Sequence, residues 1–242
     1  MSFATRPLLL SALAVSLVAT AGCAKDPAKD VPAATVAEPA AAPAAAPAPE
    51  AAPAAPAAAE PAVAPAVAAP AAAPAGDAKT LTGTIRAIGS KVTGSHVLEF
   101  KTWKGSITLT NGDASALEFE VETASVIADA DKPTPGNEKL EGHLKSPDFF
   151  DVAQFPKASF KSMSIAAGGE GGATHTIAGK LTLRGVAKDV TFPVTVAKSA
   201  TEVTGKAKFS INRKDFGIVY AGMADNLIRD DVVLEIDVKA AL

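Results

Sequence analysis

The residues of this chain that could carry chemistry are few and widely separated. There are three histidines, His96, His143 and His175, and one cysteine, Cys23. No histidine lies at metal-ligand spacing from another histidine, a cysteine or an acid, so the pattern does not indicate a zinc site. The sequence also lacks a nucleophile elbow, a phosphate-binding loop and an HExxH pair. We therefore expect no metal, no cofactor and no enzymatic activity.

Two acids flank a pair of adjacent phenylalanines. Asp148 and Asp151 stand on either side of Phe149 and Phe150, which could suggest paired carboxylates. Helix capping and first-turn placement explain the acids more simply, and Ser146 is interpreted as a cap rather than a nucleophile. Adjacent phenylalanines in a strand would point to opposite faces, whereas a short helix or irregular turn lets both face one apolar interior.

The surrounding stretch, Gly142–Ser162, reads GHLKSPDFFDVAQFPKASFKS and also holds Phe155 and Phe160. It interrupts the alternating pattern of the chain around it. We predict that it closes one end of a β-structure. It belongs to a long insertion over residues 124–156, with a helix expected at about Glu138–Lys145.

Two-residue alternation of apolar and polar side chains begins at Lys79 and is typical of strands with one buried face. About eight strands fit the pattern, one of them running from His96 to Leu109 with a bulge near Lys104-Gly105. Short turns such as Asn111-Gly112 make neighbouring strands antiparallel. Closure into a barrel would remove exposed edges. Eight strands would enclose room for side chains or one slender ligand.

Three glycines, Gly83, Gly179 and Gly205, fall on inward faces of the predicted strands. They either relieve the curvature of the barrel or leave space for a tunnel, and the sequence leaves both explanations open.

A polar cluster lies near the end of the chain, at Asn212–Gly217 and Arg229-Asp230-Asp231. Arg213 or Arg229 could attract an anionic head group, but an ion-pair network at the barrel mouth is the favoured explanation. His143 could meet a ligand head group or cap a helix. Trp103 could plug the core or flank a cavity.

The N-terminus is typical of a bacterial secretory signal over residues 1–22. Arg6 supplies positive charge, and Leu8–Val18 is an apolar run too short to span a bilayer. Thr20-Ala21-Gly22-Cys23 resembles a lipoprotein processing site, although Thr20 stands where an aliphatic residue is usual. The alternative is ordinary signal cleavage that leaves a free cysteine. We favour acylation of Cys23, the only cysteine, and expect an outer-membrane lipoprotein facing the periplasm because Ala24 follows.

Residues 23–77 are rich in Ala and Pro and are predicted to form a disordered linker. The tract is either a spacer, which could hold the domain on the order of 100 Å from its anchor, or low-complexity sequence without a role. Residues 78–242 contain 20 Lys+Arg and 20 Asp+Glu. This balance does not indicate nucleic-acid binding, and the length suits a single core.

Three long motifs give residues 80–242 a family resemblance. HLKSPDFFDVAQFPKASFKS spans 143–162, GKLTLRGVAKDVTFPV spans 179–194, and INRKDFGIVY with DNLIRDDVVLEIDV lies within 211–238. With these motifs the chain resembles the YceI-like domain family of periplasmic, lipocalin-like barrels associated with polyisoprenoid binding. The resemblance implies a lipocalin-like barrel with a short helical lid, and a bound isoprenoid or quinone-like lipid.

The favoured hypothesis is an envelope-anchored protein that binds an elongated apolar molecule inside the barrel. Arg213 or His143 would meet the polar end of that molecule. The residues expected to supply apolar contacts are Trp103, Phe119, Phe149, Phe150, Phe155 and Phe160. The alternative is a filled structural barrel that acts as a surface or stress-response module through protein contacts. A homodimer is left open as a further partner.

Overall fold

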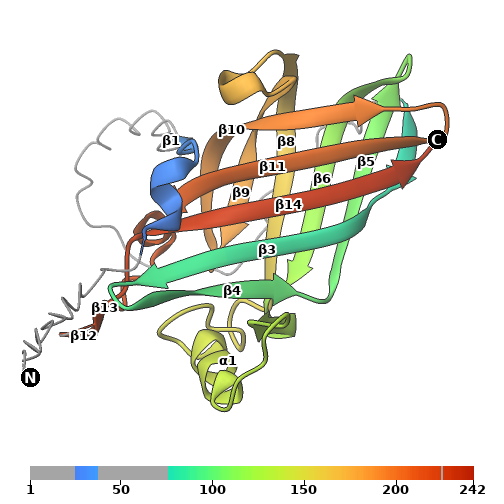
Figure 1. The fold of residues 1–242 in the computed structure, drawn as a ribbon. Helices are drawn as coiled ribbons and strands as arrows, with labels where there is room; N and C mark the ends of the chain where they lie inside the picture. The colour runs from blue at the N-terminus through green and yellow to red at the C-terminus, as the bar shows by residue number, and fades with distance from the viewer. Residues whose placement is uncertain (1–24, 38–75, 225) are drawn as a thin grey trace, which may run out of the picture.

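The structure is a computed structural model that describes residues 25–37, 76–224 and 226–242 (Figure 1). The expected signal peptide, Cys23 and most of the Ala/Pro-rich linker lie outside these residues. The described chain forms a curled antiparallel sheet with one α-helix.

The main sheet has the strand order β2-β5-β6-β8-β9-β10-β11-β14-β3-β4-β7. Its strands of seven residues or more are β3 (Thr82–Lys91), β4 (Gly94–Phe100), β5 (Trp103–Thr110), β6 (Asp113–Glu122), β8 (Lys157–Ala167), β9 (His175–Leu183), β10 (Val186–Lys198), β11 (Glu202–Asn212) and β14 (Asp231–Ala241). The shorter strands are β1 (Thr35–Ala37), β2 (Asp77–Thr80), β7 (Val126–Ala128), β12 (Gly222–Met223) and β13 (Asn226–Leu227).

Two walls enclose the core. One wall consists of β11, β14, β3 and β4, and the other of β5, β6, β8, β9 and β10. Because side chains alternate along each strand, one set meets between the walls, as at Val203, Ala207 and Phe209 of β11. This confirms the predicted all-β lipocalin-like barrel, with more strands than the eight expected.

The extra strands arise partly within residues 96–109, where the sequence predicted one strand. The chain breaks at Lys101-Thr102 instead, so that β4 pairs with β3 and β7 while β5 pairs with β6 and β2. The predicted bulge near Lys104-Gly105 is wrong, because the register shifts between Thr108 and Leu109. The break allows the two halves to enter different walls.

The chain around Leu81 joins the two walls. Leu81 alone separates β2, which pairs with β5, from β3, which pairs with β14. Gly83 has a φ of 138°, and a Cβ there would lie 2.1 Å from the carbonyl oxygen of Asp237, so the curvature explanation holds at this position. At Gly179 a Cβ would lie 2.4 Å from the Phe160 ring. The space that a side chain at Gly179 would occupy is therefore taken by the Phe160 ring and is not part of a tunnel.

The walls separate along part of the seam between β10 and β11, and residues 32–37 fill this gap (Figure 1). β10 pairs with β11 only over Thr195–Lys198. Farther along, β1 pairs with β10 at Asp189–Thr191. The Ala34 amide donates to the Ser210 carbonyl of β11 at 2.8 Å. Residues 32–37 therefore bridge both strands of the seam.

The rest of the N-terminal segment (residues 25–37) is also ordered. A 3₁₀-helix runs from Pro27 to Asp30, and the Asp26 carboxylate caps it by accepting from the Ala28 amide at 3.1 Å. These residues fall inside the range expected to be disordered linker. The difference has a tertiary cause, since open backbone groups along the seam accept a short strand that the sequence alone does not specify.

The lid, which we define as residues 137–156, begins with α1 (Asn137–Lys145), one residue longer than predicted. The helix is fastened to β7 because Glu141 accepts from the Ala128 amide at 3.0 Å and Asn137 donates to the Ala128 carbonyl at 2.8 Å. Short 3₁₀-helices occur at Thr123–Ser125, Glu170–Gly172 and Arg213–Phe216. Within the described ranges, no helix has the length and apolar character needed to cross a lipid bilayer.

Candidate functional site

A cavity of about 190 Å³ lies inside the barrel beneath the lid. Inward side chains of both walls form most of its lining, because the strand alternation directs apolar residues there. Among the residues that the structure describes, the only side chains with oxygen or nitrogen atoms in this lining are those of Thr123, Ser159 and Arg213. The aliphatic part of the lining includes Ile85, Leu98, Leu183, Ile218, Val232 and Leu234.

The lid brings both adjacent phenylalanines to the cavity wall. After α1 ends at Lys145, the Phe149 and Phe150 amides donate to the carbonyls of Ser146 and Leu144, at 3.1 and 3.0 Å. These bonds turn the chain tightly enough for both side chains to face inward. Phe150 is buried and meets Phe100 edge to face, with ring centroids 5.8 Å apart. Phe100 was absent from the predicted site, although its place in β4 indicates an inward face.

His143 lies at the outer edge of the lid and does not line the cavity. Its Nε2 is 3.0 Å from the Asp148 carboxylate. Its ring packs at right angles against Phe149 and Tyr220, with centroids 5.0 and 4.9 Å away. The imidazole therefore links the helix, the turn that follows it and the chain after the last 3₁₀-helix.

A second link across the mouth comes from Arg184. Its guanidinium donates to the carbonyl of Pro147 in the lid at 2.6 Å and to the carbonyl of Gly217. Arg184 has a φ of 50° in the two-residue turn between β9 and β10. Sequence reasoning missed this role because both acceptors are backbone atoms, which leave no trace in side-chain patterns.

Arg213 lines the cavity, but its donors are engaged by the protein. It is 4% exposed, and it donates to the carbonyls of Ile218, Ile228 and Arg229 at 2.7, 3.4 and 3.0 Å. Its Nη2 also meets the Asp230 carboxylate at 3.0 Å. Such a buried cation is stabilised by these acceptors. The arrangement matches the favoured explanation of an internal network at the mouth rather than a free head-group site.

Two other candidate residues lie away from the cavity lining. Trp103 is half-buried and packs against Phe119, with ring centroids 5.9 Å apart. Phe155 is half-buried beside the turn at Gly185, where an added Cβ would lie 2.5 Å from its ring. Its carbonyl accepts from the Thr123 hydroxyl at 3.0 Å. Both residues support neighbours that line the cavity.

Aromatic rings separate this cavity from the other end of the barrel. Phe192 stacks on Phe209 with centroids 4.2 Å apart and lies 5.5 Å from Phe160. Phe119 and Phe192 line the space on both sides. We call Phe119, Phe160, Phe192 and Phe209 the aromatic partition. Sequence reasoning had placed Phe119 and Phe160 at the site.

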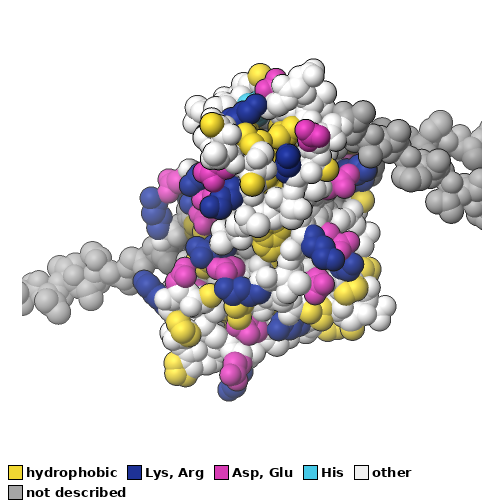
Figure 2. All heavy atoms as spheres, turned by 90° about the vertical axis from the view of Figure 1, so that its right-hand side faces the viewer, with side chains coloured by type: hydrophobic (Ala, Val, Ile, Leu, Met, Phe, Trp, Pro, Cys, Tyr) yellow, Lys and Arg dark blue, Asp and Glu magenta, His cyan; other side chains and the backbone are white. Residues whose placement is uncertain are grey.

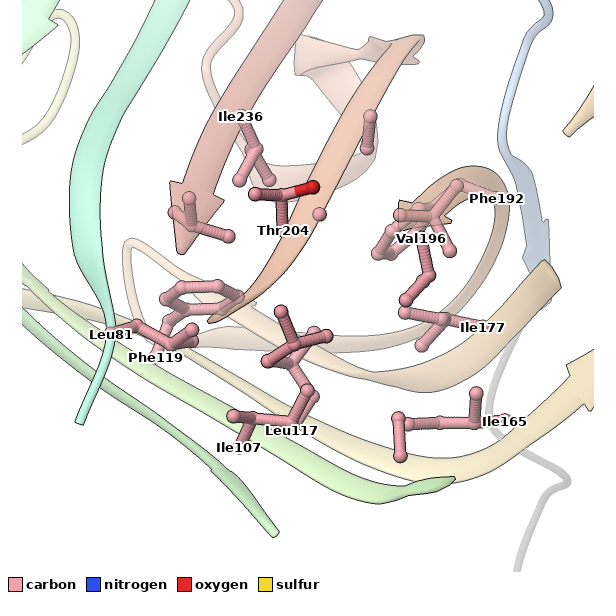
Figure 3. Close-up of a pocket in the computed structure, with 16 residues that line it drawn as sticks. Leu81, Ile107, Leu117, Phe119, Ile165, Ile177, Phe192, Val196, Thr204 and Ile236 are labelled. Carbon is pink, nitrogen blue, oxygen red and sulfur yellow. The ribbon is translucent and has the colours of Figure 1, made fainter. Parts of the chain in front are cut away.

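Beyond the aromatic partition is a second space of about 40 Å³ (Figure 3). Figure 3 shows Ile107, Leu117 and Ile177 pointing into it from one wall, and Ile236 from the other. Within the described part of the chain, Thr204 provides the only polar side chain in its lining. The barrel is therefore hollow beneath the lid and nearly filled at the opposite end.

The exterior of the strands carries many charged side chains, with both signs mixed. Figure 2, viewed from the end opposite the β12–β13 hairpin, shows basic and acidic side chains interspersed. Behind the lid cavity, Glu99 of β4 accepts from Arg86 at 3.0 Å and from Lys101. The hydrogen bond from Lys101 and the nearby Arg86 guanidinium hold the pKa of Glu99 below its ordinary value, against the opposing effect of burial.

In residues 25–37, 76–224 and 226–242, no three or more His, Cys, Asp or Glu side chains are grouped so that they could hold a metal ion. His96 instead contacts the Asp129 carboxylate at 2.6 Å, and the His175 ring contacts the Thr174 hydroxyl at 2.9 Å.

Comparison with known proteins identifies relatives in sequence and in structure. A UPF0312 protein of Pseudomonas fluorescens is 31% identical over 144 residues, which cover 56% of this chain and 70% of the relative. The crystal structure of Burkholderia cenocepacia BcnA is similar with a TM-score of 0.52 and 24% identity, covering 65% of this chain and 95% of BcnA. A polyisoprenoid binding domain from Saccharophagus degradans aligns with a TM-score of 0.49 and 17% identity, over 66% of this chain and 94% of that domain.

The family comparison agrees with the extent of the barrel. The model of the YceI-like domain matches residues 76–240, from the residue before β2 to the last residue but one of β14. The chain therefore belongs to the YceI-like domain family.

Proposed function

We propose that the barrel binds the apolar part of a small molecule, such as an isoprenoid or quinone-like lipid, in the cavity beneath the lid. The observation that carries the proposal is a space of about 190 Å³ whose lining is almost entirely apolar. Apolar cavities of about 150 Å³ remain dry and bind molecules of the size of benzene. Filling such a cavity with an apolar group is favourable, because the group makes van der Waals contacts with lining atoms that otherwise face empty space.

Two of the three polar side chains that line the cavity are hydrogen-bonded within the protein. Arg213 donates to three carbonyls and a carboxylate, and the Thr123 hydroxyl donates to the Phe155 carbonyl. The Arg213 guanidinium and the Thr123 hydroxyl are therefore hydrogen-bonded within the protein and stabilise the shape of the mouth. Recognition would therefore depend on the shape of an apolar group rather than on a charged head group.

The size of the cavity limits what it holds in this conformation. Sites for drug-sized ligands span roughly 300–1,000 Å³, so 190 Å³ suits one end of a chain molecule. A longer chain requires movement of the lid or of the aromatic partition. The ten-carbon alcohol geraniol is a suitable probe because it contains two isoprene units.

The test combines lipid identification with a cavity-filling variant. Native mass spectrometry and solvent extraction of the wild-type protein should recover an apolar compound, and geraniol should bind after its removal. Ala87→Leu adds carbon atoms to the lid cavity and should abolish binding. Ala114→Leu adds the same atoms to the small cavity and is the matched control. Wild-type protein that neither carries nor binds an apolar compound would favour a structural role for the barrel, through contacts with other proteins.

We also propose that Cys23 anchors the protein in the bacterial envelope, with the barrel in the periplasm. The support is the sequence Thr20-Ala21-Gly22-Cys23 after an apolar run. Cys23→Ser should move the protein from the membrane fraction to the soluble periplasmic fraction. Wild-type protein that is already soluble, with its N-terminus at Gly22, would refute the anchor.

A further inference from the structure

Exposed apolar side chains gather at the mouth of the barrel. We define the mouth patch as Val92, Val219, Met223 and Leu227. These are four of the large hydrophobic residues that are exposed in the described chain; the others are Met163 and Leu242. Met223 is the most exposed of the group, at 70%. Single exposed apolar residues are ordinary, but a cluster at one place indicates an interaction surface.

The mouth patch is held in a defined shape. β12 and β13 form a hairpin, and the neighbouring β3–β4 turn is hydrogen-bonded to it. The Val92 amide donates to the Leu227 carbonyl at 3.2 Å, and the Thr93 hydroxyl donates to Asn226 at 2.9 Å. Figure 1 shows the hairpin and this turn at the same end of the barrel, opposite the C-terminus. The apolar side chains therefore project from a common framework.

The chemistry of this surface differs from that of the strand exteriors. Residues 217–228 contain one charged residue, Asp225, whereas the strands carry ion pairs such as Lys206–Asp237 and Lys208–Glu235 at 2.8 and 2.6 Å. Tyr220, whose ring contacts both His143 and Phe149, lies within the same stretch. Aliphatic side chains next to an amphipathic aromatic ring suit the interface between lipid head groups and acyl chains.

The path of the chain indicates which partner covers the patch. Asp26 lies 3.5 Å from Arg229, the second residue after β13. The described chain therefore begins beside the hairpin. The preceding residues 1–24 carry the apolar run Leu8–Val18 and Cys23. Acylation of Cys23 would place a lipid chain within a few residues of the mouth patch.

We propose that the mouth patch docks on the surface of a lipid bilayer, so that the lid cavity faces the membrane. A lipid anchor holds a protein at a bilayer without fixing its orientation, and contact through the mouth patch would supply that orientation. Ile218 and Ile228 line the cavity and lie next to residues of the patch in the chain. Docking would therefore shorten the path between the bilayer and the cavity. The surface does not require the cavity to be occupied, so it can be tested independently of ligand binding.

The test uses a local probe in the full chain. Cys23→Ser removes the only native cysteine, and Met223→Cys then introduces one site for an environment-sensitive fluorophore. Met163→Cys is the matched control, because Met163 is 59% exposed on β8 and lies outside the patch. Because Cys23→Ser removes the lipid anchor, an N-terminal histidine tag tethers both labelled proteins to phosphatidylcholine–phosphatidylglycerol vesicles that contain a nickel-chelating lipid. On these vesicles, the probe at position 223 should shift to the blue and be quenched by spin-labelled lipids. The probe at position 163 should do neither.

Two outcomes would overturn the proposal. The two probes could respond equally, or the probe at position 223 could stay in water while the tethered protein sediments with the vesicles. A triple variant, Val219→Ser with Met223→Ser and Leu227→Ser, tests another partner. If the wild type is a dimer, the variant is a monomer and vesicles leave the probe unchanged, the partner is a second copy. Unchanged thermal unfolding of the variants excludes misfolding as the cause.

Discussion

The two halves of the barrel interior follow the same alternating pattern but differ in packing. Beneath the lid, side chains leave a cavity of about 190 Å³, whereas beyond the aromatic partition they leave about 40 Å³. The far end is closed by short turns such as Asn111-Gly112, whose positive φ angles allow tight reversal. The mouth is closed by an insertion and the residues after Asn212. Alternation alone therefore determines which residues face inward, while the closing segments determine how much space remains.

The strongest test of this division removes part of the aromatic partition. Phe192 is buried and lines both spaces. Phe192→Ala should lower the free energy of unfolding by about 3–5 kcal/mol, the usual cost of deleting a packed phenylalanine. It should also connect the two spaces and admit a longer chain than geraniol. Denaturant unfolding and a series of isoprenoid alcohols would measure both effects. Unchanged chain-length preference would show that the partition does not limit the ligand.

A second test compares a lid phenylalanine with the partition. Phe150 is buried but lines the larger cavity. Because part of its surroundings is already empty, Phe150→Ala should cost about 2–3 kcal/mol, below the range for a packed phenylalanine. Geraniol affinity should fall more strongly than stability does. A loss of stability as large as that of Phe192→Ala would show that the lid is packed like the core.

The outer face of the mouth half offers a test that depends on pH. Glu99 has a lowered pKa because Lys101 and Arg86 hydrogen-bond its carboxylate. The bonds therefore stabilise the protein above the ordinary carboxyl pKa of 4.5, and this contribution is lost as the pH falls through the lower folded-state pKa. Glu99→Gln should cost about 1–2 kcal/mol at pH 7. Unfolding titrations should show a shallower loss of stability below pH 4.5 in the variant, and parallel curves would contradict the assignment.

The smallest effect is expected in the filled half. Thr204 has the only polar side chain among the described residues that line the small space, and its hydroxyl donates to the Ala197 carbonyl at 3.4 Å. This bond is long, so Thr204→Val should change the free energy of unfolding by no more than about 1 kcal/mol. Geraniol binding should stay unchanged. A large loss of binding would mean that the two halves act as one site.

Much of the barrel could be predicted because burial leaves a periodic signal in the sequence. The inward set on β11 and the helix in the lid follow from this signal and from turn chemistry. The break at Lys101-Thr102 could not be predicted, because two polar residues within an alternating run carry no information on which neighbour each half pairs with. Register and pairing are set by contacts between distant segments.

The candidate site was less predictable than the fold. Adjacent Phe149 and Phe150 indicated a cavity wall because a strand cannot bury both. Trp103 and Phe155 are aromatic and partly buried, yet packing directs them elsewhere. The engagement of Arg213 depends on carbonyls brought in by the chain around β12 and β13. The volume of a cavity is the small difference between the volume enclosed by the barrel and the volume of the side chains that fill it, so composition cannot predict it.

Because β1 fills the seam between β10 and β11, the Ala/Pro-rich tract has a different role from the spacer considered above. Residues 38–75 connect β1 to β2, and both of these strands are hydrogen-bonded to the barrel. The tract therefore closes a loop instead of setting the distance between an anchor and the domain. The entropy of loop closure rises with the logarithm of length, so doubling the tract would weaken docking of β1 by only about 0.6 kcal/mol. The N-terminal segment acts as a tethered ligand of the seam, at an effective concentration that depends weakly on how many Ala-Pro units the tract contains.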